Sequence, residues 1–425
     1  MSELLRKYRN ECGLLIAILV VAGVTAAFSD AYHSSAGLAD TGRIIARESA
    51  LVGIFALGAA VVIISGGIDL SAGSVIAFSG MLFFGFLISL VPNEESTGWP
   101  NTDNIALWIV ALATLGTLAV ALLIGSFHAW LITVIRLPPF VATLASLVGL
   151  RSLARLLVQD ITQLQYNQRQ ETIGIADELL TSVARENWWI TCVIWLVLCL
   201  ATWILLSKTT IGRHLYAMGG NEEAARLSGI RTERLKWLAY CISSVTAAIS
   251  GILYACYITT SSPASDGMGY ELNAIAAAVV GGCSLTGGVG TIAGVILGTV
   301  FLRLVIDSVA KLFKSQPDIF EGSVVGALVI LAVALNELRG DGGFRKRFFP
   351  GALGILNVGI LTSLAGVLAA ATSSTGKLRN GLIVAATVLV ALAARAIVEM
   401  RVEKKRSAES EVASVWRICI TIGSR

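Results

Sequence analysis

The chain has 425 residues, of which 55% are hydrophobic and 14% charged, whereas an average soluble domain carries about 25% charged residues. The formal net charge is only +4, so no strongly basic surface for nucleic acid is indicated. The composition therefore excludes an ordinary soluble domain and indicates an all-α polytopic membrane protein.

Long apolar stretches follow one another along the chain. A helix needs about 20 predominantly apolar residues to cross a hydrocarbon core about 30 Å thick. Several stretches reach or approach this length without one charged side chain. They cover residues 12–29, 49–68, 70–93, 105–127, 187–207, 237–265 and 350–376.

The distribution of basic residues predicts the orientation. The segment 1–11 is basic and has no small-residue cleavage site, so we expect an uncleaved, cytoplasmic N-terminus. The loop 207–236 is rich in Lys and Arg and is then cytoplasmic too, whereas 92–104 and 258–271 contain neither. Four basic side chains near the outer surface in this scheme are expected to extend toward the lipid headgroups. They are Arg43, Arg47, Arg151 and Arg155.

A polar segment at 212–237 lies between two apolar stretches. In it, Asn221 is expected to cap a short helix with an acidic first turn and a basic last turn, and Gly229 can end that helix. A helix of about seven residues is only about 10 Å long. At the membrane surface, such a helix suits contact with a cytoplasmic protein. The residues predicted for this contact are Asn221, Glu222, Glu223, Ala224, Arg226 and Gly229.

Two glycine-rich turns, at 66–73 and 281–288, interrupt apolar stretches and match at equal offsets. Such interruptions in two parts of a transporter indicate its pathway, although glycine hairpins also look alike by chance. The second turn divides the charge-free run 272–302, which we expect to form two short traverses near 271–283 and 289–308. The candidate pathway or gating residues are Gly66, Gly67, Asp69, Ser71, Gly281, Gly282, Ser284, Gly287 and Gly288.

Some residues in the apolar stretches have competing interpretations. Asp69 is expected to cap a helix that begins near Leu70, with a gating role as the alternative. Arg303 and Asp307 are four residues apart and are expected to pair on one helix face. Three glycines are expected to form a smooth helix face for close packing rather than a dinucleotide-binding loop: Gly290, Gly294 and Gly298.

The sequence contains no motif for a cofactor, a metal or catalysis. It has no Cys-x-x-Cys pair, no His-Glu-x-x-His and no Gly-x-x-x-x-Gly-Lys-[Ser/Thr] loop. We therefore predict no catalytic residue, no metal site and no cofactor, and any ATP must be bound and hydrolysed by another polypeptide. The scarcity of carboxylates inside the apolar stretches argues against an ion-coupled carrier.

Three blocks of sequence resemble one transporter family. They are Ile-Ser-Gly-Gly-Ile-Asp-Leu-Ser-Ala-Gly-Ser at 64–74, the polar stretch 216–230 and the glycine hairpin 274–288. In this order, they resemble the ribose/xylose/galactose permeases of ABC importers, most closely the xylose type. Branched-chain amino acid permeases are more distant relatives.

The resemblance implies a permease core of ten spans at 12–338, with the coupling loop 207–236, in the lipid of a prokaryotic cell membrane. The implied partners are cytoplasmic ABC ATPase subunits, a second permease copy and an extracytoplasmic solute-binding protein. The solute would be a monosaccharide, either a pentose such as xylose or ribose or a hexose. The alternatives are a branched-chain amino acid or a nucleoside carried by the same superfamily, or a stand-alone secondary carrier.

The chain continues well beyond the usual end of such a core. We expect a cytoplasmic linker at 339–349, two additional transmembrane segments within 350–399 and a cytoplasmic tail at 400–425. The additional segments are expected to pack on the core or face lipid, with a regulatory role as the alternative.

Overall fold

The computed structural model describes residues 9–29, 32, 34–94, 99–312, 322–328, 330, 351–372 and 376–395. The chain divides into two compact units, Met1–Asn336 and Glu337–Arg425. The tenth span of the predicted core falls largely outside the described residues, as do the predicted linker 339–349 and tail 400–425.

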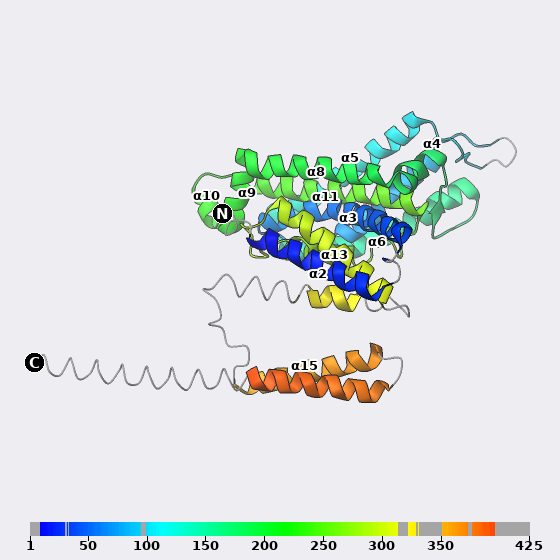
Figure 1. Cartoon of the computed structure of the whole chain (residues 1–425). Helices are drawn as coiled ribbons and strands as arrows, with labels where there is room; N and C mark the ends of the chain where they lie inside the picture. Colours follow the sequence, from blue (N-terminus) through cyan, green and yellow to red (C-terminus); the bar gives the residue numbers. More distant parts are fainter. Residues whose placement is uncertain are drawn as a thin grey trace, which may run out of the picture. The chain divides into compact units, whose positions relative to one another are not determined.

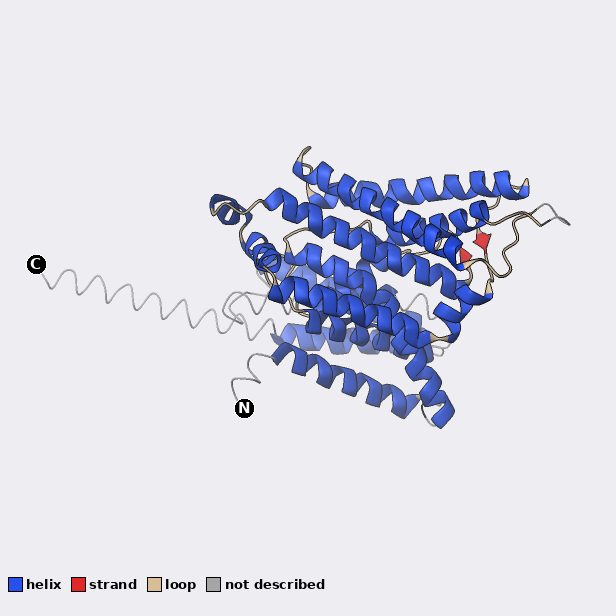
Figure 2. Cartoon of the chain, turned by 90° about the horizontal axis from the view of Figure 1, so that it is seen from above, coloured by secondary structure: helices blue, strands red, loops and turns tan. Residues whose placement is uncertain are grey.

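The first unit is built of helices that lie side by side (Figures 1 and 2). A two-residue antiparallel pairing between β1 and β2 joins two loops at one end, and the short helices α9 and α10 lie at the opposite end (Figures 1 and 2). The elements are α2 Arg9–Phe28, α3 Ser35–Ile64, α4 Ala72–Leu90, α5 Leu107–Thr133, α6 Pro139–Tyr166, β1 Ile173–Gly174, α7 Glu178–Thr181, the π-helix Ser182–Glu186, α8 Trp188–Lys208, α9 Thr210–Gly220, α10 Glu222–Leu227, α11 Thr232–Ile258, β2 Thr260–Ser261, α12 Tyr270–Val280 and α13 Ile292–Leu312.

Within the described residues, nine helices are long and apolar enough to cross a membrane. This confirms the predicted all-α polytopic membrane class. Eight of the nine, from α2 to α13, belong to the first unit, and the ninth is Lys377–Arg395 in the second.

The short traverse predicted near 271–283 contains one short helix, α12. Helix α12 has only 11 residues and is about 16 Å long, roughly half the hydrocarbon thickness. Irregular backbone precedes it, and Gly267 in that backbone packs against the backbone of Gly73 at the start of α4. Arg151 of α6 donates to the carbonyl oxygens of Pro263 and Asp266 in the same loop, at 3.0 and 2.9 Å. The loop is therefore supported by protein, as irregular backbone at membrane depth requires.

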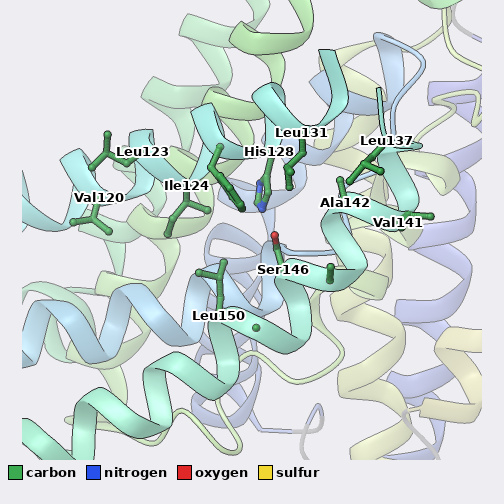
Figure 3. A pocket seen from close by; sticks show the side chains of 13 residues that line it. Val120, Leu123, Ile124, His128, Leu131, Leu137, Val141, Ala142, Ser146 and Leu150 are labelled. Carbon is green, nitrogen blue, oxygen red and sulfur yellow. The ribbon is translucent and has the colours of Figure 1, made fainter. Parts of the chain in front are cut away.

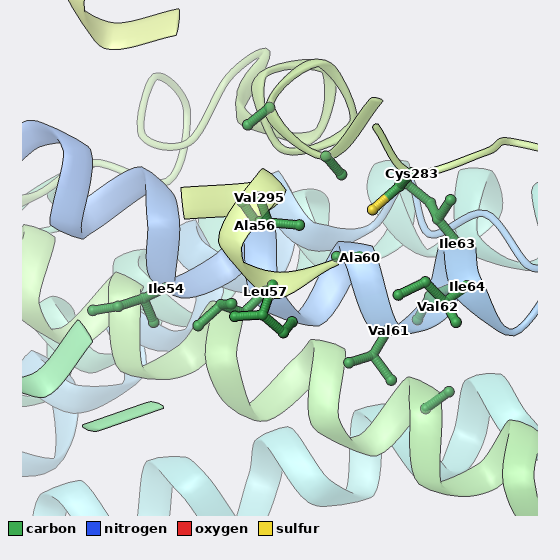
Figure 4. Packing of buried hydrophobic residues seen from close by; sticks show 14 of the residues in the cluster. Ile54, Ala56, Leu57, Ala60, Val61, Val62, Ile63, Ile64, Cys283 and Val295 are labelled. Atoms are coloured by element: carbon green, nitrogen blue, oxygen red, sulfur yellow. The ribbon is translucent and has the colours of Figure 1, made fainter. Parts of the chain in front are cut away.

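Helix α3 lies at the centre of the first unit and packs against α8, α11, α12 and α13. Its side chains are buried almost without interruption from Ala50 to Ile64. Figure 4 shows Leu57, Ala60 and Val61 of α3 in this core, together with Val295 of α13. A helix that is apolar all round is expected at such a central position.

Glycines allow the closest helix contacts, as the sequence predicts for two of its three candidates. A methyl group on Gly294 would overlap the carbonyl oxygen of Gly281, and one on Gly298 would overlap that of Ala277. Gly290 lies before α13, beside Cys283 and Ile64, and so takes no part in the helix face.

The predicted Arg303–Asp307 pair is wrong. Arg303 donates to the carboxylate of Glu48 on α3 at 2.9 Å, and Asp307 pairs with Lys311 at 2.7 Å. Both ion pairs are largely buried. Arg303 therefore takes its partner from a neighbouring helix rather than from its own. Three of the four arginines expected near the headgroups make protein contacts, and one of them, Arg43, pairs with Asp40 at 3.4 Å. Arg151 binds the loop before α12, and Arg47 lies over the ring of Tyr257, 3.9 Å from its centroid.

The second unit is described for α15, Gly351–Thr372, and for the helix Lys377–Arg395. The helices pack through small residues, since a methyl group on Gly381 would lie 2.8 Å from the carbonyl oxygen of Gly366. Their outer faces are apolar. These helices correspond to the two additional apolar segments that the sequence predicts.

Candidate functional site

The polar segment forms a corner of three helices in which α10 is the exposed middle piece. Asn221 Oδ1 accepts from the backbone N–H of Ala224 at 3.0 Å, which caps α10 as the sequence predicts. Gly229 has a φ of +83°, and this left-handed conformation, which glycine favours, turns the chain toward α11. Helix α10 has six residues and is therefore about 9 Å long.

Ion pairs hold the corner and shape its surface. Glu222 of α10 pairs with Lys236 of α11 at 2.6 Å, so the two helices are tied together. Glu223 accepts from Arg226 at 2.6 Å on the exposed side, and this hydrogen bond and the carboxylate charge raise the pKa of the Arg226 guanidinium. Ala225 is buried beneath them. Leu227 is 80% exposed, so the corner presents an apolar side chain beside a charged pair.

Glycines from three Gly-Gly pairs, distant in the sequence, meet at the base of this corner. The pairs are Gly66-Gly67 after α3, of which only Gly66 takes part, Gly219-Gly220 at the end of α9 and Gly287-Gly288 before α13. We call Gly66, Gly219, Gly220, Gly287 and Gly288 the glycine junction.

Backbone touches backbone throughout the glycine junction. The N–H of Gly288 donates to the carbonyl oxygen of Ile64 at 2.9 Å. A methyl group on Gly219 would overlap that same oxygen, and one on Gly287 would lie 2.8 Å from Gly66 Cα. Gly287 and Gly288 also have positive φ, at +87° and +73°. The end of α9 is therefore in direct contact with both glycine-rich turns, without intervening side chains.

Asp69 lies in the break between α3 and α4 and is only 3% exposed. Its Oδ1 accepts from the backbone N–H and the hydroxyl of Ser71, at 2.8 and 2.6 Å. Its Oδ2 accepts from the hydroxyl of Ser243 on α11 at 2.7 Å. We call Asp69, Ser71 and Ser243 the Asp69 cluster. A buried carboxylate needs such partners, because an unpaired one would be costly.

The predicted role of Asp69 as the cap of a helix near Leu70 is wrong. Helix α4 begins at Ala72, and its N-cap residue is Ser71. Asp69 instead bonds the residue two positions on and a residue of α11, so it links the break to a second helix. The carbonyl of Ile68 strengthens this link, since it accepts from Tyr240 of α11 at 3.3 Å and from Thr143 of α6 at 3.4 Å.

The four remaining predicted pathway residues lie in different places. Gly67 lies beside the hydroxyl of Tyr240, and Gly281 forms the close contact between α12 and α13. Gly282 has a φ of +95° and turns the chain after α12. The Ser284 hydroxyl lies 2.7 Å from that of Thr286 in the hairpin. Their role in a pathway stays a prediction.

Sequence reasoning missed several residues that complete this site. Gly219 and Gly220 form a third glycine pair, and the recurrence of the pair just before Asn221 was a signal that could have found them. Tyr216 was also missed; its hydroxyl donates to the carbonyl of Gly290 at 2.8 Å. Tyr240 and Ser243 gave no local signal, because each meets its partner about 170 residues away along the chain. Within the described part of the chain, no group of three or more His, Cys, Asp or Glu residues could hold a metal ion.

Known proteins similar to this chain are membrane permeases. The family described as the permease component of the branched-chain amino acid transport system matches residues 43–333. The chain is 31% identical over 342 residues to the probable ABC transporter permease protein y4mJ of Sinorhizobium fredii, covering 79% of this chain and 91% of that protein. It is 30% identical to the ribose import permease protein RbsC of Escherichia coli, covering 76% and 92%. It is 28% identical to the xylose transport system permease protein XylH of Escherichia coli, covering 68% and 83%. No solved structure matches the chain significantly.

The glycine junction predicts that alanine substitutions at Gly219 and Gly220 have different effects on stability. We expect Gly219→Ala to lower the free energy of unfolding by about 1–3 kcal/mol, because its methyl group would overlap the Ile64 carbonyl. Gly220→Ala is the matched control, since a Cβ there meets nothing within 4 Å. Thermal unfolding of the purified protein in detergent measures both. Equal stability of the two variants would contradict the junction.

The Asp69 cluster predicts different effects for two substitutions. Asp69→Leu removes the acceptor of three hydrogen bonds and should destabilise the protein by about 1–3 kcal/mol for each donor left without a partner. Asp69→Asn keeps one oxygen for Ser71 and offers an N–H to the Ser243 hydroxyl, so its effect should be much smaller. Thermal unfolding in detergent compares them, and Ser243→Ala should fall between. An Asn variant as unstable as the Leu variant would show that the charge itself is required.

Proposed function

Because the chain belongs to the family of permease components of the branched-chain amino acid transport system, we propose that it is the membrane-spanning permease subunit of an ABC importer for a monosaccharide. The observation that supports this most is the contact between the α9–α10 corner and both glycine-rich turns. A small exposed helix is thereby joined to two breaks in membrane-spanning helices.

The corner is the proposed docking element for a cytoplasmic ABC ATPase. Leu227 supplies apolar surface, and Glu223 and Arg226 supply charges beside it. In this proposal, Asn221, Glu222 and Gly229 maintain the corner by capping, pairing with Lys236 and turning the chain. The orientation that places the N-terminus and this corner in the cytoplasm is part of the proposal, and the positive charge of 207–236 supports it.

The glycine junction gives a route for the movement. When the ATPase subunits close on ATP, they displace α10, and α9 moves with it as a rigid body. No side chains separate the end of α9 from the turns at Gly66 and Gly287-Gly288. The displacement of α9 therefore moves these turns directly. Both turns end or begin a spanning helix, and their shift opens or closes the proposed path. This permease needs no catalytic residue of its own.

The named relatives favour a sugar over an amino acid. They include a ribose import permease protein and a xylose transport system permease protein. A pentose or a hexose, delivered by a solute-binding protein to a pair of permease copies, is therefore the proposed cargo.

Uptake in the native host tests this function. Deleting the gene should abolish high-affinity uptake of one labelled monosaccharide among ribose, xylose and hexoses, and the wild-type chain should restore it. The tagged chain should co-purify with an ABC ATPase from a detergent extract. Liposomes that contain the chain alone should show no sugar flux, because the motive force comes from the ATPase. Flux through the chain alone would instead establish a stand-alone carrier.

The proposed docking role of the corner predicts that alanine substitutions at two exposed leucines affect uptake differently. Leu227→Ala should lower ATP-dependent uptake about tenfold, because the apolar contact with the ATPase is lost. Leu196→Ala on α8 is the control, since Leu196 is 56% exposed but lies near the middle of a spanning helix. Both variants should reach the membrane in wild-type amounts, measured by immunoblot. Equal uptake by the two variants would rule out Leu227 as a contact.

A further inference from the structure

A cavity of about 550 Å³ lies between α5 and α6 in the first unit. These helices follow one another in sequence, yet they make little contact with each other and leave this space between them. Aliphatic and aromatic side chains form nearly all of its wall, among them Ile124, Leu131, Val141 and Leu150 (Figure 3). The two polar side chains in the wall are His128 and Ser146.

His128 has no exposed surface, and neither of its ring nitrogens has a hydrogen-bond partner among the described residues. The ring packs edge-on to Tyr240, with centroids 6.4 Å apart, and Tyr240 in turn donates to the carbonyl of Ile68, next to Asp69. Asp69 is already bonded to Ser71 and Ser243. A neutral imidazole presents one donor and one acceptor, and leaving both unsatisfied in the interior is unfavourable.

Ser146 faces His128 from the other helix. Figure 3 shows the hydroxyl oxygen of Ser146 directed toward the imidazole. The Ser146 carbonyl accepts from Ser74 at 3.5 Å, but its hydroxyl bonds no described residue, although serines in helices often bond the carbonyl four residues back. Two unsatisfied polar groups therefore converge on one point of an otherwise apolar wall.

We propose that this cavity binds the hydroxyl end of an uncharged membrane lipid. A hydroxyl donates one hydrogen bond and accepts others, so it can satisfy both the imidazole of His128 and the hydroxyl of Ser146. The apolar wall takes the hydrocarbon, and a pocket of this size with few polar groups suits one such ligand. The carboxylate of Asp69 nearby disfavours an anionic head. A monosaccharide does not fit, because two polar groups cannot satisfy the hydroxyls around its ring.

Photolabelling of the full chain in phosphatidylcholine vesicles tests the proposal. The probe is a long-chain primary alcohol with a photoreactive diazirine in its chain, and labelled peptides are located by mass spectrometry. Saturable labelling is expected within 120–150. The unlabelled alcohol should displace the probe at about tenfold lower concentration than the hydrocarbon of equal length, as expected when one or two hydrogen bonds distinguish them. Ribose and xylose should not displace it.

Variants separate the polar contact from the apolar wall. His128→Leu should remove the advantage of the alcohol over the hydrocarbon, and Ser146→Ala should reduce it. His128→Gln keeps a donor and an acceptor and should retain most of it. Thermal unfolding should show that each variant is folded, since His128→Leu removes unsatisfied buried polar atoms. Equal displacement by alcohol and hydrocarbon in the wild type, or displacement by a sugar, would overturn the proposal.

Discussion

The carbonyl oxygen of Ile64 is the atom on which the site depends. It accepts the N–H of Gly288 at 2.9 Å and occupies the position that a side chain on Gly219 would need. One oxygen at the end of α3 thus joins the turn before α13 to the end of α9. Packed backbones are stiff and cannot deform continuously. The backbone contacts therefore leave little room for the corner that carries α10 to shift against the two glycine-rich turns.

The break between α3 and α4 is stable because its polar groups have partners in other helices. Irregular backbone inside a membrane is tolerated only where protein or a watery cavity surrounds it. Here α11 supplies Ser243 to Asp69 and Tyr240 to the Ile68 carbonyl, while α6 supplies Thr143. The carboxylate that would be costly alone is thus part of the support for the break. The same argument applies to the loop before α12, which Arg151 holds.

Local patterns in the sequence predicted the features that depend on residues close together in the chain. Apolar stretches gave the spanning helices, and Asn221 with its acidic neighbours gave α10 and its cap. Partners across helices could not be predicted. Arg303 had a correctly spaced acid on its own helix but pairs with Glu48 on α3, and Asp69 had a helix start beside it but bonds α11 as well. The partners of Arg303 and Asp69 depend on which helices lie side by side. The periodicity of the sequence does not determine this arrangement. The convergence of the glycine pairs escaped prediction for the same reason.

Helix α11 connects features that otherwise look separate. At its first turns, Lys236 is paired with Glu222 of α10. One turn further, Tyr240 donates to the Ile68 carbonyl in the break, and its ring lies against His128 at the cavity between α5 and α6. Ser243 then holds Asp69. Between Lys236 and Ser243, α11 therefore contacts the corner, the break and the wall of the cavity. The corner and the break consequently share two structural connections, the glycine junction and α11, and both would carry the displacement that we propose for α10.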